Sequence, residues 1–278
     1  MIHWKTGGIA IAIEADIWYN IPQKNEYFIV KEKYMKAIVL AAGKGKRLHS
    51  ELSDLPKVMR SANGKPLLEY ALNAIGFIPN EDICIVVGYK KEKVMERFTQ
   101  GYQFAEQAEQ LGTGHAVRMA KPLFEGYQGN VLITYGDMPL LKRETFEQMC
   151  SQHEKSGAAC TLMSAVIQTP PAYGRLVRDQ NGKLLKIVET KDCNEEQLKI
   201  KEVNIGVYVF DSQKLFQYLE RLKNNNVQNE YYLTDVPEMM MADGLKVDTF
   251  TITDESQVWG VNTQEELDRC EAILKNRQ

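Results

Sequence analysis

The first feature that could do chemistry is a short strand that is broken by glycines and surrounded by positive charges. Residues 37–42 form an apolar run rich in strand formers, which is typical of a strand buried on both faces. Gly43 and Gly45 interrupt this run, and glycine lets backbone N–H groups approach a ligand that side chains would keep away. The cations around this loop are Lys44, Lys46, Arg47 and Lys57. Amides and flexible cations after a parallel strand are suited to binding a polyphosphate.

Two common phosphate-binding motifs do not fit this stretch. The dinucleotide fingerprint needs a third glycine at position 48, where the chain has Leu48. The P-loop needs two glycines separated by four residues and followed by lysine and a hydroxyl residue, a pattern that this stretch lacks. An ordinary basic junction between a strand and a loop, or another kind of nucleotide-binding loop, stays open at this point.

Composition places the chain among ordinary globular proteins. Its 278 residues can bury a large core, and contents of 44% hydrophobic and 26% charged residues are typical of such proteins. The formal net charge of −3 offers no electrostatic basis for binding nucleic acid. No apolar run approaches the roughly 20 residues of a membrane helix, so we expect no membrane insertion.

The cysteines indicate neither a disulfide framework nor a zinc site. Five are present, an odd number, and none has the CxxC spacing or the histidine pairing that is typical of zinc binding. They are Cys84, Cys150, Cys160, Cys193 and Cys270. This pattern favours a reduced, cytoplasmic location.

Residues 1–34 contain apolar residues without a clean period and are the least interpretable part of the chain. Met35 directly precedes the predicted strand, where a domain of this kind would begin. We hypothesise that Met35 is the true start and that residues 1–34 are an upstream translation or a dispensable extension. An extra strand or a docking arm is the alternative. We expect residues 35–278 to form one domain, because we find no domain linker in them.

Strands and helices alternate through the first half of the chain. The apolar patterns predict strands at 37–42, 82–88, 102–106 and 130–137. They predict helices at 65–75, 90–98, 114–124 and 143–154. Such alternation predicts an α/β fold with a mostly parallel, doubly wound, Rossmann-like sheet.

The second half changes character and contains a predicted hairpin. Its arms, 174–178 and 183–189, flank the turn-forming stretch Asp-Gln-Asn-Gly. Further strands are predicted at 160–167, 203–210 and 246–253, and helices at 212–223, 233–242 and 263–275. Ser212 suits the N-cap of the predicted helix at 212–223, and Thr263 with Glu266 has the capping-box pattern for the predicted helix at 263–275. We expect the hairpin to form a small lobe beside the main sheet.

The stretch Gln107-Ala-Glu-Gln-Leu-Gly-Thr-Gly-His-Ala116 is the most specific motif. It closely resembles the uracil-recognising segment of bacterial N-acetylglucosamine-1-phosphate uridylyltransferases, and the loop at 36–59 resembles the signature of sugar nucleotidyltransferases in general. The Gln107 amide offers the donor and the acceptor that a pyrimidine edge needs, and Gly112 lets the backbone come close. His115 alone suggests a nucleophile or metal ligand, but no other histidine is suitably spaced, so we interpret it as a helix residue.

The resemblance also implies how the nucleotide is held. It implies nucleotide contacts at Leu40, Ala41, Ala42, Gly43, Gln107, Gly112 and Thr113. It implies phosphate contacts and a catalytic role for Arg47 and Lys57. The chain departs from the family at Lys46, where a small hydroxyl residue is usual, and in the loop at 48–56, which looks a few residues longer.

A metal site is implied at the end of the third strong strand. Tyr135-Gly-Asp-Met-Pro139 lies where ligands bind in open α/β sheets. In the resembling family this aspartate, Asp137, holds Mg²⁺, and Asn262 matches the second metal ligand. Mg²⁺ prefers a few oxygen ligands and several retained waters. A turn cap for Asp137 and a local turn role for Asn262 are the alternatives.

Three more segments match the family in the expected order: 173–176, 187–191 and 203–206. The resemblance implies that the hairpin lobe binds the sugar, with contacts at Tyr135, Gly136, Gly174, Glu189, Asn204 and Asn262. Carboxylate and amide groups suit sugar hydroxyls, although each residue alone could serve a turn or the surface. The segment 229–235 also resembles the family, without a role that we can assign from sequence.

The implied reaction joins UTP and N-acetylglucosamine 1-phosphate to give UDP-N-acetylglucosamine and pyrophosphate, with Mg²⁺ as the cofactor. No hexapeptide repeat follows, so we expect no β-helix acetyltransferase domain. One alternative is a nucleotidyltransferase that uses another sugar 1-phosphate or another base. A second alternative is a non-catalytic protein that binds a UDP-sugar. The sequence does not address the oligomeric state.

Overall fold

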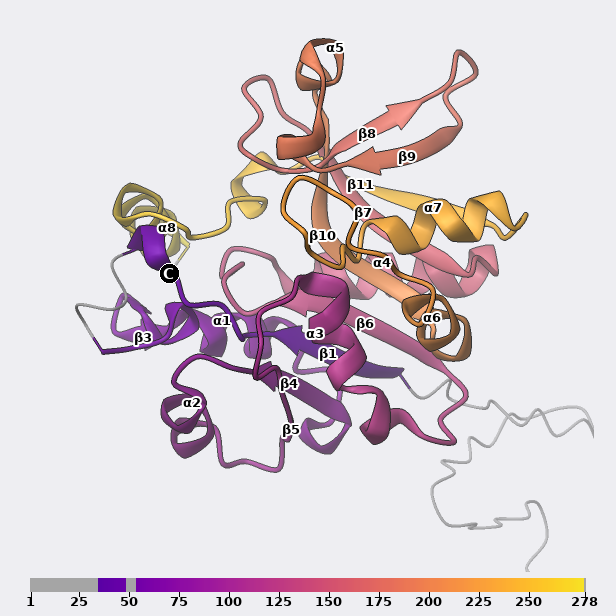
Figure 1. Cartoon of the computed structure of the whole chain (residues 1–278). Coiled ribbons are helices and arrows are strands. Elements are labelled where there is room, and N and C mark those ends of the chain that lie inside the picture. The colour runs from indigo at the N-terminus through magenta and orange to yellow at the C-terminus, as the bar shows by residue number, and fades with distance from the viewer. Residues whose placement is uncertain (1–34, 49–53, 278) are drawn as a thin grey trace, which may run out of the picture. The chain divides into compact units, whose positions relative to one another are not determined.

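The computed structural model describes residues 35–48 and 54–277 (Figure 1). Residues 1–34 lie outside the described residues, and with them the hypothesis about the start of the chain. Residues 49–53, in the loop at 48–56 that looks longer than is usual in the family, also lie outside the described residues. The chain divides into two units, Met1–Tyr34 and Met35–Gln278, and the second contains every helix and strand described.

Nine strands form one mixed sheet within the described residues. The main path of this sheet has the order β11-β7-β10-β6-β1-β4-β5. These strands span Val247–Ile252 (β11), Cys160–Val166 (β7), Glu202–Asp211 (β10), Asn130–Tyr135 (β6), Met35–Leu40 (β1), Ile83–Val87 (β4) and Gln103–Glu106 (β5). Of the strands described on this path, only β10 runs antiparallel to its neighbours. The predicted mostly parallel α/β sheet is confirmed.

Helices cover both faces of this sheet. They span Leu67–Ala74 (α1), Lys91–Arg97 (α2), Thr113–Met119 (α3), Arg143–Ser156 (α4), Glu195–Leu198 (α5), Ser212–Leu219 (α6), Asp235–Ala242 (α7) and Gln264–Asn276 (α8). Successive strand residues point to opposite faces, so Ala37 and Val39 pack with α1 and α4. Ile38 and Leu40 pack with α3 and α6 on the other face. None of these described helices has the length and apolar character that crossing a membrane would require.

The predicted hairpin is present and extends the sheet. Strands β8 (Arg175–Arg178) and β9 (Leu184–Val188) pair antiparallel, and Arg175 of β8 also pairs with Val203 of β10. Figure 1 shows β8, β9 and α5 together at the top of the view, beyond the parallel strands. The hairpin therefore forms a lobe at one end of the β10 strand, as expected.

One predicted helix cap is confirmed and another is wrong. Thr263 and Glu266 form the capping box at α8, in which each side chain accepts a hydrogen bond from the other residue's backbone N–H. Ser212 is not the N-cap of α6 but its first residue. Asp211 is the cap, because its backbone is extended and its carboxylate accepts from the Lys214 N–H at 2.9 Å.

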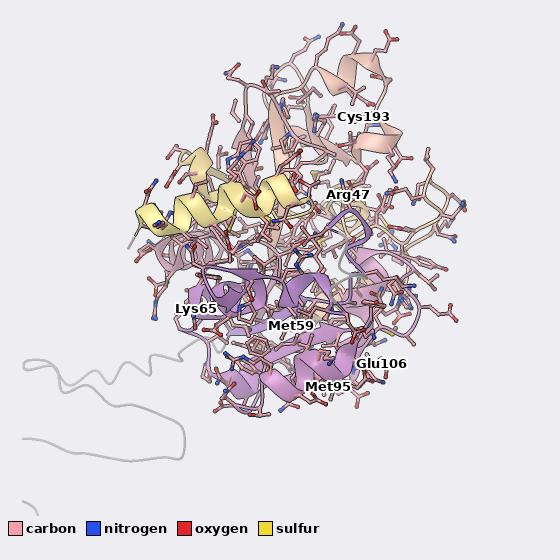
Figure 2. The ribbon with its side chains drawn as sticks, turned by 90° about the vertical axis from the view of Figure 1, so that its left-hand side faces the viewer. Arg47, Met59, Lys65, Met95, Glu106 and Cys193 are labelled. Atoms are coloured by element: carbon pink, nitrogen blue, oxygen red, sulfur yellow. The ribbon has the colours of Figure 1, made fainter. Side chains whose placement is uncertain are left out.

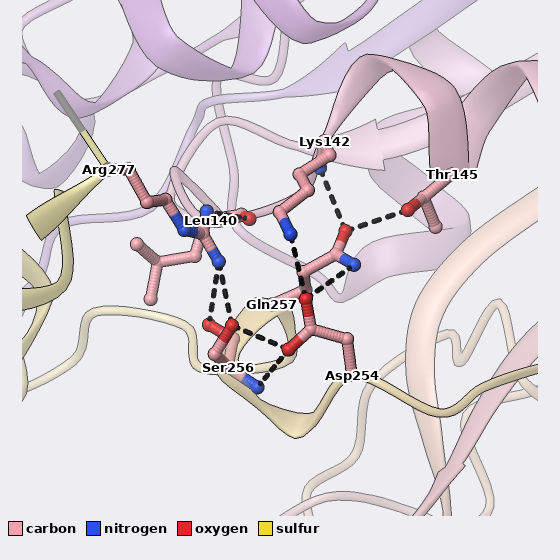
Figure 3. A network of polar contacts seen from close by, with 7 residues as sticks. All are labelled: Leu140, Lys142, Thr145, Asp254, Ser256, Gln257 and Arg277. Atoms are coloured by element: carbon pink, nitrogen blue, oxygen red, sulfur yellow. Dashed lines mark hydrogen bonds and ion pairs between the residues drawn. The ribbon is translucent and has the colours of Figure 1, made fainter.

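A buried glutamine ties the chain between β11 and α8 to the start of α4 (Figure 3). The side-chain oxygen of Gln257 accepts from the Lys142 N–H at 3.0 Å and from the Thr145 hydroxyl at 2.7 Å. The Lys142 ammonium also forms an ion pair of 2.8 Å with Asp254. The C-terminal segment is thus fixed to the body of the domain shortly before it reaches Asn262.

Gly206 provides a test of the packing around Tyr135. Its φ is +83°, and a Cβ added to it would lie 2.5 Å from the Tyr135 ring. Gly182 also has a positive φ, +79°, but an added Cβ would meet no atom within 4 Å. Gly206→Ala should therefore lower the free energy of unfolding by about 1–3 kcal/mol more than Gly182→Ala does. Urea unfolding measures both, and equal losses would show that the ring of Tyr135 moves at no cost.

Candidate functional site

A pocket of about 260 Å³ lies at the carboxyl ends of β1 and β6. Lys57, Tyr135 and Asp137 line it. Its lining also contains every residue predicted to contact the nucleotide, namely Leu40, Ala41, Ala42, Gly43, Gln107, Gly112 and Thr113. Distant parts of the sequence therefore meet at the edge where open α/β sheets bind ligands.

Four polar side chains converge beside this pocket. The Lys57 ammonium donates to the Asp137 carboxylate and, at 2.8 Å, to the Asn262 side-chain oxygen. Arg47 donates to the same oxygen of Asn262 at 3.3 Å. Figure 2 shows Arg47 on the loop after β1, beside the end of α8. The structure thus brings together two of the four cations that the sequence indicated, Arg47 and Lys57, and the two oxygen-bearing residues.

Each of these groups is placed by its own element. Asp137 follows the end of β6, and Lys57 begins a 3₁₀ turn, Lys57–Met59, after Pro56. Asn262 precedes the cap of α8, and the Glu266 carboxylate accepts from the Asn262 N–H. The Val261 N–H donates to the Asp137 carbonyl oxygen at 3.0 Å, so the two chain segments are joined directly.

The oxygens of Asp137 and Asn262 form a donor set suited to a hard cation. An ammonium, that of Lys57, already contacts both oxygens, so a positive charge is accommodated there. Within the described residues there is no cluster of three or more carboxylate, histidine or cysteine side chains that could hold a metal. A cation at this place would therefore take its other ligands from water or phosphate.

The Gln107 side chain is almost fully buried and its amide orientation is determined by its partners. Its nitrogen donates to the Gly112 carbonyl oxygen at 3.0 Å and lies 3.1 Å from Nδ1 of His115. Because a carbonyl oxygen only accepts, the nitrogen faces Gly112, and the donor of Gln107 is engaged within the protein. Burial lowers the pKa of His115, which favours the neutral ring, in which one of the two nitrogens can accept. His115 lies in α3, as expected for a helix residue.

In the structure, the backbone that lies close to Gly112 belongs to another segment of the protein. Its φ is +108°, and an added Cβ would lie 2.7 Å from the carbonyl oxygen of Tyr231. The Tyr231 N–H donates to Leu111 at 2.8 Å, and the Gly114 N–H donates to Tyr231 at 2.8 Å. The segment at 229–235, which had no role from sequence, therefore closes over the start of α3.

The structure adds residues to the pocket that the motifs did not single out. Glu230 lines it from the segment at 229–235, and Gln110 lines it from the motif before α3. Val58 and Ala116 contribute apolar surface. The family resemblance of 229–235 was a usable signal for Glu230, and Val58 lies within the signature at 36–59, next to Lys57.

Of the six predicted sugar contacts only Tyr135 lines this pocket, and five do not: Gly136, Gly174, Glu189, Asn204 and Asn262. Gly174 packs against Ile187, and the Asn204 amide is used internally, donating to the Tyr208 hydroxyl at 2.6 Å. Glu189 lines a second pocket, of about 310 Å³. The Gly136 N–H donates to the Leu40 carbonyl oxygen at 3.0 Å. The sugar-binding roles of these residues stay predictions.

The second pocket is acidic. Its four carboxylates, those of Glu189, Asp192, Asp235 and Glu238, outnumber the two ammonium groups in its lining, Lys186 and Lys223. The Thr234 hydroxyl donates to Glu189 at 3.0 Å, while burial raises the pKa of that carboxyl. Burial, with the charges of its neighbours, raises the pKa of Asp235 to about 6.

Comparison with known proteins identifies the family. A family model described as "Nucleotidyl transferase" matches residues 36–259, most of the chain. The chain belongs to the nucleotidyl transferase family. The family resemblance inferred from the glycine loop and the segment at 107–116 is confirmed.

Two bacterial relatives illustrate how close the similarity is. The "Bifunctional protein GlmU" of Bacillus mycoides (strain KBAB4) is 43% identical over 241 residues, which cover 87% of this chain and 52% of that protein. The GlmU of Clostridium perfringens (strain SM101 / Type A) is 45% identical over 243 residues, with coverages of 87% and 52%. The chain spans about half the length of the curated relatives it matches.

A solved structure supports the fold assignment. The crystal structure of UDP-glucose pyrophosphorylase complexed with UDP-glucose superposes with a TM-score of 0.68 and covers 88% of this chain and 99% of that one. At 18% identity the likeness concerns the fold alone. Together with the family match, it establishes the nucleotidyl transferase architecture of the sheet.

The raised pKa of Asp235 predicts a pH-dependent loss of stability. The carboxyl pKa is 3.8 when unperturbed and about 6 in the folded chain. Below the unfolded-state pKa Asp235 is protonated in both states, and its contribution to the free energy of unfolding is fully present. That contribution is lost as the pH rises through the folded-state pKa. As the pH rises between these two pKa values, the free energy of unfolding of Asp235→Asn should therefore increase relative to wild type by on the order of 2 kcal/mol. Urea unfolding at several pH values tests this, and parallel profiles for the two proteins would contradict it.

Proposed function

We propose that the protein is a sugar-1-phosphate uridylyltransferase that forms UDP-N-acetylglucosamine and pyrophosphate from UTP and N-acetylglucosamine 1-phosphate. The observation that carries this proposal is the meeting of Lys57, Asp137 and Asn262 beside a pocket lined by Gln107 and Gly112. The similarity of the chain to GlmU proteins supports it.

The reaction needs no general base, because a sugar 1-phosphate is already an anion at neutral pH. Its phosphate oxygen attacks the α-phosphorus of the nucleotide in line, the new P–O bond forms, and the bond to pyrophosphate breaks. The protein supplies alignment and charge neutralisation. Lys57 neutralises charge on the α-phosphate, and Arg47 neutralises charge on the departing pyrophosphate.

Asp137 and Asn262 are the residues that would hold Mg²⁺. One carboxylate oxygen and one amide oxygen, with water and phosphate completing the shell, match the preference of this ion. When bound, it would neutralise phosphate charge and help to orient the reacting groups. Lys57 must then leave these two oxygens, and the nearby phosphate offers its ammonium a new partner.

The orientation of Gln107 supports uracil over cytosine. Its amide nitrogen is engaged with Gly112, so we assign the carbonyl oxygen to the base. That oxygen can accept from the N3–H of uracil, whereas N3 of cytosine is itself an acceptor. The donor that the sequence suggested for Gln107 is not needed in this assignment.

Lys57→Ala should have opposite effects on turnover and on metal binding. Turnover should fall on the order of 10²-fold, because a group that neutralises developing charge is lost. Binding of Mn²⁺ to the free protein should become tighter, because the ammonium no longer competes for Asp137 and Asn262. Pyrophosphate release and Mn²⁺ paramagnetic resonance are the measurements. Lys121→Ala, which removes an exposed ammonium paired with Glu220, is the matched control.

Near-normal turnover of Lys57→Ala would remove Lys57 from the mechanism. Unchanged Mn²⁺ affinity would instead refute competition between the ammonium and the metal, without bearing on catalysis.

A substrate panel tests the proposed reaction itself. UTP, dTTP, CTP and ATP are each combined with N-acetylglucosamine 1-phosphate and with glucose 1-phosphate, in the presence and absence of Mg²⁺. We expect the fastest pyrophosphate release from UTP with N-acetylglucosamine 1-phosphate, and only with Mg²⁺. A faster pair would reassign the substrate, and binding of UDP-sugar without turnover would favour a non-catalytic binding protein.

A further inference from the structure

The hydroxyl of Tyr173 lies between two backbone groups of a distant segment. It donates to the Val258 carbonyl oxygen at 2.9 Å and accepts from the Gly260 N–H at 2.8 Å. Val258 and Gly260 are both buried. Since buried backbone groups need partners, these two bonds fix the path of the chain at 258–260.

The other side of this segment rests on the end of β6. The Val261 N–H donates to the Asp137 carbonyl oxygen at 3.0 Å. A Cβ added to Gly260 would lie 2.9 Å from Sδ of Met138 and 3.2 Å from the Tyr173 hydroxyl. Asn262 follows at once, so its position relative to Asp137 depends on a short segment that is held from both sides.

Tyr173 also contacts the hairpin lobe. Its carbonyl oxygen accepts from the Thr190 hydroxyl at 2.7 Å and from the Arg175 guanidinium. Gly174 follows Tyr173 in the chain and Glu189 precedes Thr190, and both are predicted sugar contacts. One residue therefore joins the predicted sugar lobe to the segment that leads to Asn262.

The tyrosine hydroxyl suits both of its partners chemically. Burial raises the pKa of Tyr173 well above its usual value, so the group stays protonated. A protonated hydroxyl donates one hydrogen bond and accepts others, which matches one carbonyl and one N–H. Phenylalanine keeps the ring but makes neither bond, so Tyr173→Phe isolates their contribution.

We infer that Tyr173 is a positioning residue for the reaction. It sets the distance between Asn262 and Asp137, and it couples the occupancy of the sugar lobe to the affinity of this residue pair for a divalent cation. The inference rests on the proposed function for the identity of the sugar and the metal. Because such coupling is reciprocal, sugar 1-phosphate should tighten metal binding and metal should tighten sugar 1-phosphate binding.

The experiment measures Mn²⁺ binding to the whole chain by paramagnetic resonance, without nucleotide and therefore without turnover. In Tyr173→Phe the dissociation constant for Mn²⁺ should rise roughly tenfold, as is typical when support of a metal ligand is lost. Addition of N-acetylglucosamine 1-phosphate should tighten Mn²⁺ binding in the wild type and have a smaller effect in the variant. In turnover assays the Mg²⁺ concentration for half-maximal rate should rise, and saturating Mg²⁺ should largely restore the rate.

Tyr127→Phe is the matched control. Its hydroxyl also donates to a backbone carbonyl oxygen, that of Asn130, at 2.9 Å, but at the opposite end of β6 from Asp137. Mn²⁺ affinity should be unchanged in this variant. Gly260→Ala crowds the same segment against Met138 and the Tyr173 hydroxyl, and it should weaken Mn²⁺ binding in the same direction as Tyr173→Phe.

Equal Mn²⁺ affinity in wild type, Tyr173→Phe and Gly260→Ala would overturn the inference and leave the proposed function standing. A lower melting temperature of Tyr173→Phe with unchanged Mn²⁺ affinity would overturn it too, because only stability would then depend on the hydroxyl. A wild-type chain that binds no Mn²⁺ would overturn both the inference and the metal site of the proposed function. If no pair in the substrate panel releases pyrophosphate but Tyr173→Phe still binds Mn²⁺ tenfold more weakly, the proposed reaction alone would be refuted.

Discussion

The ammonium of Lys57 lies between the carboxylate of Asp137 and the side-chain oxygen of Asn262, and the rest of the site depends on this contact. The partners are 80 and 205 positions from Lys57 in the sequence. The side chains of Lys57 and Asp137 are only 13% and 19% exposed, and largely buried charges are tolerated only when they are paired. The fold must therefore bring three remote segments to one point with little freedom.

The sheet accomplishes most of this convergence. Strands β1 and β6 are parallel neighbours, so the glycine loop and Asp137 follow them at the same edge. Asn262 reaches that edge from the C-terminal segment, which Gln257 holds at one end and the α8 capping box at the other. A rigid arrangement of charges suits a reaction in which alignment and neutralisation do the work.

The part of the pocket lined by Gln107 and Gly112 is built differently, because backbone segments pack directly against each other there. A Cβ added to Gly112 would meet the backbone of Tyr231 at 2.7 Å, and one added to Gly114 would meet the Leu222 side chain and, at 3.0 Å, the Tyr231 carbonyl oxygen. Thr113, between them, accepts a hydrogen bond from the Leu233 N–H at 3.0 Å. A motif that resembles a base-recognising segment therefore also specifies an internal contact, and Gly112 both lines the pocket and packs against Tyr231.

The sequence by itself determined the strands, the alternation of helices, the capping box at Thr263 and the membership of the nucleotidyl transferase family. These features are local, because apolar period, cap residues and motif spacing are read within a few neighbouring positions. Only the tertiary structure decided that Asp211 and not Ser212 caps α6, and that the Gln107 side-chain nitrogen donates to the Gly112 carbonyl oxygen. It alone also decided that the Tyr173 hydroxyl forms hydrogen bonds with the backbone of Val258 and Gly260. Each of these depends on backbone angles or on contacts made across the packed core, and such contacts leave no period or spacing in the chain.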